Sequence, residues 1–310
     1  MTKGKPFIKW VGGKGQLIEQ LEALLPADFD AWKGVTYIEP FVGGGAMLFH
    51  MLQAHPNIKS AVINDINPDL TACYTVVRDR PLELLAALSE LQRQYYSLTN
   101  EENRRNYFLD KRALYNTRAL DIVENSALFL FLNRTCFNGL YRVNKSGLFN
   151  VPFGKYVTPG ICDKQTILAD SRLLQNVEIL TGDFEQTFCR MENPTLFYFD
   201  PPYRPLSTTS SFNDYAKEGF NDPEQVRLKE FCDRITAAGG TFMLSNSDCL
   251  AKNEQDRFFE DLYASYSIER VWATRNVNAN ASKRGKLTEI LVRNYCCPVE
   301  QYMTVEPEII

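Results

Sequence analysis

Asp200-Pro201-Pro202-Tyr203 combines residue types that can bind a flat base through its exocyclic amino group. The tetrapeptide follows the apolar run 196–199, which is typical of a buried strand, and sites in α/β proteins open where strands end. The aspartate supplies acceptors, the prolines supply carbonyls that a regular ladder cannot use, and the tyrosine supplies a ring face. Such a set suits an amino-bearing nucleobase. The same residues are also good turn formers, so the tetrapeptide alone does not separate a site from a strand-ending turn.

A glycine-rich turn follows an earlier expected strand, residues 35–38, and leads into a helix. Gly43 and Gly45 allow positive φ and a close approach of a ligand to the backbone. The dinucleotide pattern G-x-G-x-x-G is absent, because Leu48 occupies the third glycine position. The pattern that remains, Phe41-x-Gly-x-Gly, resembles the turn of enzymes that bind S-adenosylmethionine.

Asp65 ends the next apolar segment, twenty residues after Gly45. An acid at this spacing is placed to bind the hydroxyls of a ribose. The alternative is a helix cap, since Asp65-Ile66-Asn67-Pro68 also resembles the start of a helix. Turn, acid and spacing together favour S-adenosylmethionine as the cofactor.

Strand and helix patterns alternate at both ends of the chain, which predicts a mostly parallel sheet with helices on both faces. The expected helices are 15–25, 45–52, 68–78 and 223–238, with another that starts near residue 166. The expected strands are 35–38, 60–63, 177–180, 196–199 and 241–244, followed at one edge by an antiparallel pair, 266–271 and 289–294. The predicted fold class is therefore α/β with a Rossmann-like core.

The middle of the chain has a different pattern. Residues 80–132 are rich in Leu, Arg, Glu and Gln and predict a helical segment, whereas residues 135–160 are rich in Gly, Asn and aromatic residues. We interpret the middle as a mainly helical insertion that carries a β-hairpin and divides the core in two. The boundaries of this interpretation are 71–164 for the insertion, 1–70 and 165–297 for the core, and 298–310 for a tail.

Composition narrows the class of protein. Of the 310 residues, 45% are hydrophobic and 23% are charged, and no apolar run approaches the length of a membrane span. The N-terminus lacks a signal-peptide pattern, so we expect a cytoplasmic protein without a membrane partner. Eight cysteines without a Cys-x-x-Cys pair, and two histidines near none of them in sequence, argue against a disulfide framework and a metal site.

The distribution of charge matters more than its sum. The net charge of −4 argues weakly against a nucleic-acid partner. However, residues 134–156 contain four basic residues and no acid, and residues 270–293 contain six basic residues and one acid. A cationic face on an acidic protein suffices to bind a nucleic-acid backbone, although two solvated loops would give the same pattern.

The first of these basic segments contains Asn138-Gly139, the preferred sequence of a tight hairpin turn. A hairpin tip that carries Phe137 and Leu140 can wedge into a base stack opened by flipping. Arg142 is suited to bidentate hydrogen bonds with O6 and N7 of guanine. A structural hairpin with a solvated arginine is the alternative.

These motifs, in this order, resemble the Dam-type (α-group) DNA adenine-N6 methyltransferases over about residues 5–295. Lys9-Trp10-x-Gly-Gly-Lys14 is similar to the N-terminal motif of that family, and Asn138-Gly-Leu-x-Arg142 is similar to its recognition hairpin. The resemblance implies an S-adenosylmethionine-dependent core and a target-recognition domain in the inserted segment. The family commonly has Tyr where Phe137 stands, so the stacking ring is kept and the phenol is lost.

The resemblance also implies roles for single residues. It places Trp10 near the methionyl end of the cofactor, Lys14 near its carboxylate and Asp183 near its adenine. The implied cofactor-binding set is Trp10, Lys14, Phe41, Gly43, Gly45, Asp65, Asp183 and Asp200. The implied DNA-binding set is Lys9, Phe137, Asn138, Leu140, Arg142, Pro152 and Tyr156, with Arg142 reading the first guanine of GATC in double-stranded DNA.

The implied reaction is transfer of a methyl group to N6 of an adenine flipped out of the duplex. Asp200 and the Pro201 carbonyl would accept the N6 hydrogens and Tyr203 would stack on the base, so the expected catalytic set is Asp200, Pro201, Pro202 and Tyr203. No metal or covalent intermediate is expected. A cytosine-N4 methyltransferase, which usually has Ser in place of Asp200, and a catalytically silent DNA-binding protein are the alternatives. Whether the enzyme acts beside a restriction endonuclease is left open.

Overall fold

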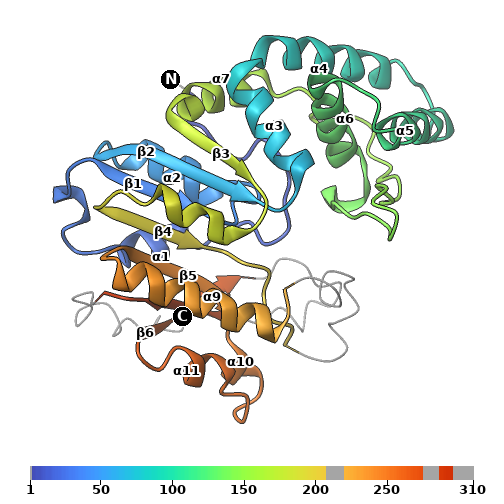
Figure 1. Ribbon diagram of the computed structural model, residues 1–310. Coiled ribbons are helices and arrows are strands. Elements are labelled where there is room, and N and C mark those ends of the chain that lie inside the picture. Colours follow the sequence, from blue (N-terminus) through green and yellow to red (C-terminus); the bar gives the residue numbers. More distant parts are fainter. Residues whose placement is uncertain (1, 207–219, 275–285, 296–310) are drawn as a thin grey trace, which may run out of the picture. The chain divides into compact units, whose positions relative to one another are not determined.

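The computed structural model describes residues 2–206, 220–274 and 286–295 (Figure 1). The chain forms two compact units, which are described separately. Unit 1 comprises the described residues of 1–15, 41–56 and 60–187, and unit 2 comprises those of 16–40, 57–59 and 188–310.

Seven strands follow the order β3-β2-β1-β4-β5-β7-β6 (Figure 1). Their bounds are β1 Val35–Glu39, β2 Ile58–Asp65, β3 Val177–Thr181, β4 Thr195–Phe199, β5 Thr241–Ser247, β6 Ser267–Thr274 and β7 Lys286–Arg293. The pairs β1–β4, β4–β5 and β2–β3 are parallel, whereas β7 is antiparallel to both β5 and β6. The first five positions have the strand order of a doubly wound sheet. The predicted strands and the antiparallel edge pair are confirmed, and the fold is Rossmann-like.

Strands β1 and β4 could be predicted from the sequence because they are buried along their whole length. Every residue of β1 and of β4 is buried, so each reads as a continuous apolar run. Ile38 lies opposite Phe197, and Phe197 lies opposite Phe242 of β5, which sets the register in unit 2. The last residue of β1 is Glu39, and β4 ends directly before Asp200, so both acids lie where parallel strands end.

Unit 1 is mainly helical, as the pattern of residues 80–132 predicted. Its helices are α2 Ala46–Ala54, α3 Pro68–Asp79, α4 Pro81–Tyr96, α5 Glu101–Asn116, α6 Ile122–Thr135 and α7 Lys164–Leu173. Helix α6 is apolar on most of its surface because it packs against α3, α4 and α5 (Figure 1). Side chains that accept backbone N–H groups begin α3, α5, α6 and α7; these caps are Asn67, Asn100, Asp121 and Asp163.

Unit 2 contains the helices α1 Ile18–Ala23, α9 Asp222–Ala237, α10 Cys249–Lys252 and α11 Phe258–Leu262. The described residues also form short 3-10 turns: η1 Phe29–Ala31, η2 Phe137–Gly139, η3 Leu174–Asn176 and η4 Phe184–Arg190. Among the described residues, no helix is both long enough and apolar enough to cross a bilayer. The six cysteines within the described ranges have free thiols. The cytoplasmic location stays a prediction.

Candidate functional site

The glycine-rich turn of unit 1 is fixed by the end of β2. Gly43 and Gly45 have φ of +48° and +74°, which side-chain-bearing residues rarely adopt. The Gly43 N–H donates to Asp65 Oδ2 at 3.1 Å, and the Val42 N–H donates to the carbonyl of Asn64 at 2.9 Å. A Cβ on Gly43 would lie 2.8 Å from Trp10 Cδ1. Turn, acid and indole therefore converge at one place in unit 1.

Asp65 acts as an anchor for two backbone segments. Besides Gly43, its carboxylate accepts the Asn67 N–H at 2.9 Å. Burial raises the pKa of Asp65, and the bonds from these N–H groups act in the opposite direction. The alternative interpretation of Asp65 as a helix cap is wrong, because Asn67 caps α3 by accepting the N–H groups of Asp69 and Leu70.

The segment that contains Asp183 lies beside the same loop. The Gly182 N–H donates to the carbonyl of Asp65 at 3.0 Å, and the Asn64 side chain donates to the carbonyl of Gly182 at 3.0 Å. Asp183 accepts the Glu185 N–H at 2.9 Å and so starts the turn η4. The Phe41 ring lies 5.3 Å from the ring of Phe184. These contacts bring the positions predicted for the cofactor's adenine next to the glycine-rich turn, and Lys14 of the same unit is buried.

Trp10 joins this cluster to the basic segment that follows α6. Its ring stacks on Tyr141, with centroids 5.7 Å apart and planes at 24°. Tyr141 Oη donates to Asp69 Oδ2 at 3.2 Å, and Arg118 forms an ion pair with the same carboxylate at 2.7 Å. Tyr141 occupies the variable position of the Asn-Gly-Leu-x-Arg motif, so the sequence alone gave no reason to single it out.

A buried asparagine connects the N-terminal motif to the Asn-Gly turn. Asn133 of α6 accepts the Lys9 N–H at 3.0 Å and donates to the carbonyls of Lys9 and Gly139 at 2.9 and 2.8 Å. The Lys9 ammonium lies 5.3 Å from the centroid of the Tyr156 ring. Three residues predicted from separate motifs, Lys9, Asn138 and Tyr156, thus lie in one region of unit 1. The sequence analysis missed Asn133, which reads as one more position of an apolar helix.

The recognition hairpin differs from the prediction in where its tip lies. Asn138 and Gly139 do form a tight turn, with φ of 55° and 66° and a bond from the Leu140 N–H to the Phe137 carbonyl. The antiparallel bridges, however, join Cys136 to Phe153 and Val143 to Phe149. The tip is therefore at residues 144–147, where the Gly147 N–H donates to the Asn144 carbonyl. The Asn-Gly turn is an excursion, a local turn within the first arm of the hairpin, between Cys136 and Val143. The bonds of Asn133 hold that excursion against α6, which explains why it does not close a regular pair of strands.

The exposed side chains of this segment suit contact with a duplex. Phe137 is 51% exposed, although it is a large apolar residue. Arg142 is exposed and folds back on Asn150, to which its Nε donates at 2.7 Å and its Nη2 at 3.3 Å. Pro152 is exposed, and its carbonyl accepts the N–H of Phe137 at 2.8 Å.

The predicted base clamp belongs to unit 2. Asp200 is half-buried, Pro201 is buried and Pro202 is exposed. Tyr203 Oη donates to Glu289 Oε2 of β7 at 2.6 Å. Burial raises the pKa of Tyr203, and the negative charges of Asp200 and Glu289 raise it further, so the ring carries a neutral phenol. The sequence analysis did not predict the role of Glu289 in orienting this ring.

Glu39 is a buried acid close to the clamp. Burial raises its pKa from 4.5 to about 8, the hydrogen bond from Tyr37 at 2.6 Å lowers it, and the charge of Asp200 raises it. Between these two pH values the folded protein keeps a proton that the unfolded chain has released. The free energy of unfolding therefore falls as pH rises from about 4.5 to about 8.

Glu39→Gln should remove this part of the pH dependence, because the amide can still accept the Tyr37 hydroxyl and never ionises. Relative to the wild type, we expect the variant to gain about 1.4 kcal/mol of stability per pH unit between pH 5 and 8. Urea unfolding at several pH values measures it. Glu192→Gln, at an exposed position, is the control, and parallel curves for wild type and Glu39→Gln would contradict the prediction.

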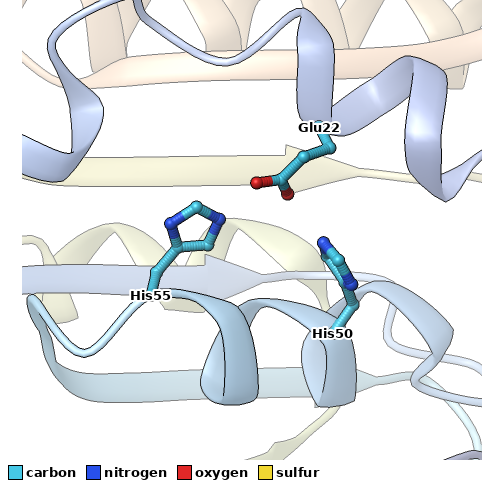
Figure 2. Close-up of side chains that lie close together, drawn as sticks. All are labelled: Glu22, His50 and His55. Carbon is cyan, nitrogen blue, oxygen red and sulfur yellow. The ribbon is translucent and has the colours of Figure 1, made fainter.

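Figure 2 shows His50, which lies in α2, and His55, which directly follows that helix. Their rings lie 6.4 Å apart at 78°. Glu22, also drawn there, belongs to α1 of unit 2. Imidazole nitrogens are common metal ligands, so the expectation of no metal stays a prediction.

The strand order and the glycine-rich turn define a Rossmann-like protein. Proteins of this architecture generally bind ligands at the carboxyl ends of their strands. Residues 10–277 match the model of the D12 class N6 adenine-specific DNA methyltransferases, and the chain belongs to this family. It is therefore an adenine-specific DNA methyltransferase, as the resemblance predicted.

Named relatives match the chain along nearly its whole length. It is 44% identical over 294 residues to the type II methyltransferase M.MjaIII of Methanocaldococcus jannaschii, covering 94% of this chain and 99% of that protein. It is 39% identical over 296 residues to the type II methyltransferase M1.LlaDCHI of Lactococcus lactis subsp. cremoris, covering 94% and 95%. It is 30% identical over 291 residues to the DNA adenine methylase of Escherichia coli (strain K12), again covering 94% and 95%.

Proposed function

We propose that the enzyme transfers the methyl group of S-adenosylmethionine to N6 of the adenine of GATC in double-stranded DNA, after flipping that adenine out of the helix. The observation that carries the proposal is the convergence of Trp10, Gly43 and Asp65 in unit 1. The Gly43 backbone allows close approach of a ligand, the Trp10 indole can contact a cationic sulfonium, and the Asp65 carboxylate can accept hydrogen bonds from a ribose.

The residues present fit this methyl donor. Asp65 has acceptor capacity beyond the N–H groups that it already binds, since a carboxylate offers about four acceptor positions. Trp10 faces the methionyl end and the buried Lys14 pairs with the carboxylate of the donor. Phe41 and Asp183 lie on the adenine side, where the ring of Phe184 supports Phe41. The donor supplies an activated methyl group on sulfur.

The target adenine occupies the clamp of unit 2. Adenine N6 is a poor nucleophile because its lone pair is delocalised into the ring. Asp200 and the carbonyl of Pro201 accept the two N6 hydrogens, which shifts the nitrogen toward sp³ and aims its lone pair at the methyl group. Tyr203 stacks on the base, and its bond to Glu289 fixes the tilt of the ring. The nitrogen gains the methyl group and then releases a proton, which becomes acidic only once the methyl group is attached, and S-adenosylhomocysteine is the other product. The effect is positioning plus electrostatics, without a covalent intermediate on the protein.

The basic segment after α6 contacts the duplex. Phe137 and Leu140 fill the space that the flipped base leaves, and Arg142 reads the first guanine. Lys9, Asn138, Pro152 and Tyr156 lie along the same surface. Residues 71–164 then form the target-recognition domain, residues 1–70 and 165–297 the catalytic core, and residues 298–310 a tail.

A methyl-transfer assay on two duplexes tests the proposal. Labelled methyl should pass from S-adenosylmethionine to a GATC duplex and not to a GTTC duplex, and the product should be N6-methyladenine. Equal labelling of both duplexes would refute the GATC site, and a labelled cytosine would refute the adenine target.

The type II names of two relatives support a role beside a restriction endonuclease. Resistance of host DNA to a GATC-cutting endonuclease that adenine methylation blocks would test it.

A further inference from the structure

The buried amide side chains of Gln225 and Asn246 form hydrogen bonds with the backbone on either side of Tyr203. Gln225 Nε2 of α9 donates to the carbonyl of Pro202 at 3.1 Å. Asn246 Nδ2 of β5 donates to Gln225 Oε1 at 3.0 Å, and the Arg204 N–H donates to Asn246 Oδ1 at 3.2 Å. The pair, here called the amide clamp, thus bridges the peptide groups that flank the aromatic residue of Asp-Pro-Pro-Tyr.

The two backbone groups that the amide clamp contacts, the Pro202 carbonyl and the Arg204 N–H, determine which way each amide points. The carbonyl of Pro202 can only accept, so Gln225 must present its NH₂ group there and its oxygen to Asn246. The Arg204 N–H can only donate, so Asn246 must present its oxygen to it. Ser247 confirms this orientation, because its N–H donates to the same oxygen at 2.8 Å.

Both side chains of the amide clamp are completely buried, although glutamine and asparagine are usually exposed. Apolar residues would fill the same space but would leave the Pro202 carbonyl and the Arg204 N–H without these partners. A fully satisfied buried network rigidifies the segment that it contacts.

Arg204 provides a second anchor for the same loop. Its carbonyl accepts the Ser247 hydroxyl at 2.8 Å, and its guanidinium forms ion pairs with Asp222 and Asp256 at 2.8 and 2.6 Å. The guanidinium also lies 4.4 Å from the centroid of the Phe258 ring. The backbone after Tyr203 is therefore fixed, and the prolines restrict the backbone before it.

We infer that Gln225 and Asn246 are positioning residues for methyl transfer: they hold the Tyr203 ring and the Pro201 carbonyl where the target adenine needs them. The inference rests on the proposed function, in which Tyr203 stacks on that base. Asp200, the Pro201 carbonyl and the Tyr203 ring can bind one adenine together only if the loop that carries them is preorganised. Small displacements of catalytic groups lower the rate strongly.

Two nearly isosteric variants each remove one donor. In Gln225→Glu the carboxylate still accepts from Asn246 but repels the Pro202 carbonyl, and in Asn246→Asp the carboxylate still accepts from Arg204 and Ser247 but cannot donate to Gln225. We expect kcat on a GATC duplex to fall by about 10²-fold in each. The Kd for S-adenosylmethionine should be close to the wild-type value. The control is Thr195→Val in β4, whose hydroxyl is buried without a partner among the described residues and should leave kcat unchanged.

Two further readouts separate positioning from a loss of folding. The activity of Gln225→Glu relative to the wild type should rise as pH falls, because a protonated carboxyl can again donate to the Pro202 carbonyl. A duplex with 2-aminopurine at the target position should fluoresce more strongly in complex with either variant, because stacking on Tyr203 quenches that base. Thr195→Val should follow the wild type in both measurements.

The outcomes distinguish the inference from the proposed function. If the wild type methylates GATC while the two variants turn over like Thr195→Val, the inference alone is overturned. Variants that no longer fold would assign the amide clamp to stability and would also overturn it. A wild type that does not methylate GATC would refute the proposed function and the inference together.

Discussion

Asp200→Ala should lower kcat for methylation of a GATC duplex by about 10³-fold or more, while the Kd for S-adenosylmethionine changes by less than about tenfold. The carboxylate accepts an N6 hydrogen most strongly when the nitrogen has become pyramidal, so its loss removes a transition-state contact. The residues that converge around the glycine-rich turn are untouched by the change. Single-turnover kinetics together with titration of the donor separate the two effects.

Asp200→Asn sharpens this test. The amide keeps one acceptor but adds a donor that opposes the amino group of adenine, so we expect a loss of activity nearly as large as for alanine. The charge of Asp200 also contributes to the raised pKa of Glu39, and either variant should lower that pKa. Normal turnover in Asp200→Ala would show that another group accepts the N6 hydrogens and that the proposed mechanism is wrong.

Arg142→Ala should lower discrimination at the first base pair of GATC by about 1–3 kcal/mol. The guanidinium can present two parallel donors to guanine, whereas alanine presents none. In the structure Arg142 donates through Nε and Nη2 to Asn150, which orients the guanidinium. The measurement is kcat/KM on GATC and on its first-position variants at one salt concentration, since phosphate contacts change affinity with salt.

Arg142→Lys is the matched control, because it keeps the positive charge and loses the planar pair of donors. It should restore much of the affinity for duplex DNA but little of the preference for guanine. Asn150→Ala removes the support of the guanidinium and should fall between the wild type and Arg142→Ala. An unchanged preference for GATC in Arg142→Ala would exclude this residue as the reader of the first guanine.

The core of the fold was predictable because its signals are local. Strands β1 and β4 are buried along their whole length and therefore read as apolar runs, and the turn after β1 reads as Phe-x-Gly-x-Gly. The acid at the end of β2 was singled out by its spacing to Gly45 together with the turn, and its role toward a ribose stays a prediction. The helices of unit 1 were predictable from their composition. Helix ends were less predictable: α1 of unit 2 spans Ile18–Ala23, whereas a helix over 15–25 was expected.

The parts of the site that were missed depend on partners far apart in the chain. Asn133 bonds to Lys9 across 124 positions, and nothing near Asn133 in the sequence indicates that bond. Asn246 bonds to Gln225 across 21 positions, and each residue reads as an ordinary member of its strand or helix. The Asn-Gly turn was predicted correctly, but the tip of the hairpin was not, because the bonds of Asn133 decide which turn closes the arms.

The sequence by itself determined the α/β class and, through the order of the motifs, the adenine-specific class of enzyme, and it singled out the glycine-rich turn with its acid and the Asp-Pro-Pro-Tyr tetrapeptide as the predicted donor and base sites. These features are short and covalently continuous, so residue type and spacing are enough to express them. Only the tertiary structure decided how Asp65 anchors Gly43, where the recognition hairpin turns, and that Gln225 and Asn246 hold the peptide groups around Tyr203. The physical reason is that a buried polar group must find a hydrogen-bond partner in space, and the identity of that partner depends on packing rather than on sequence distance.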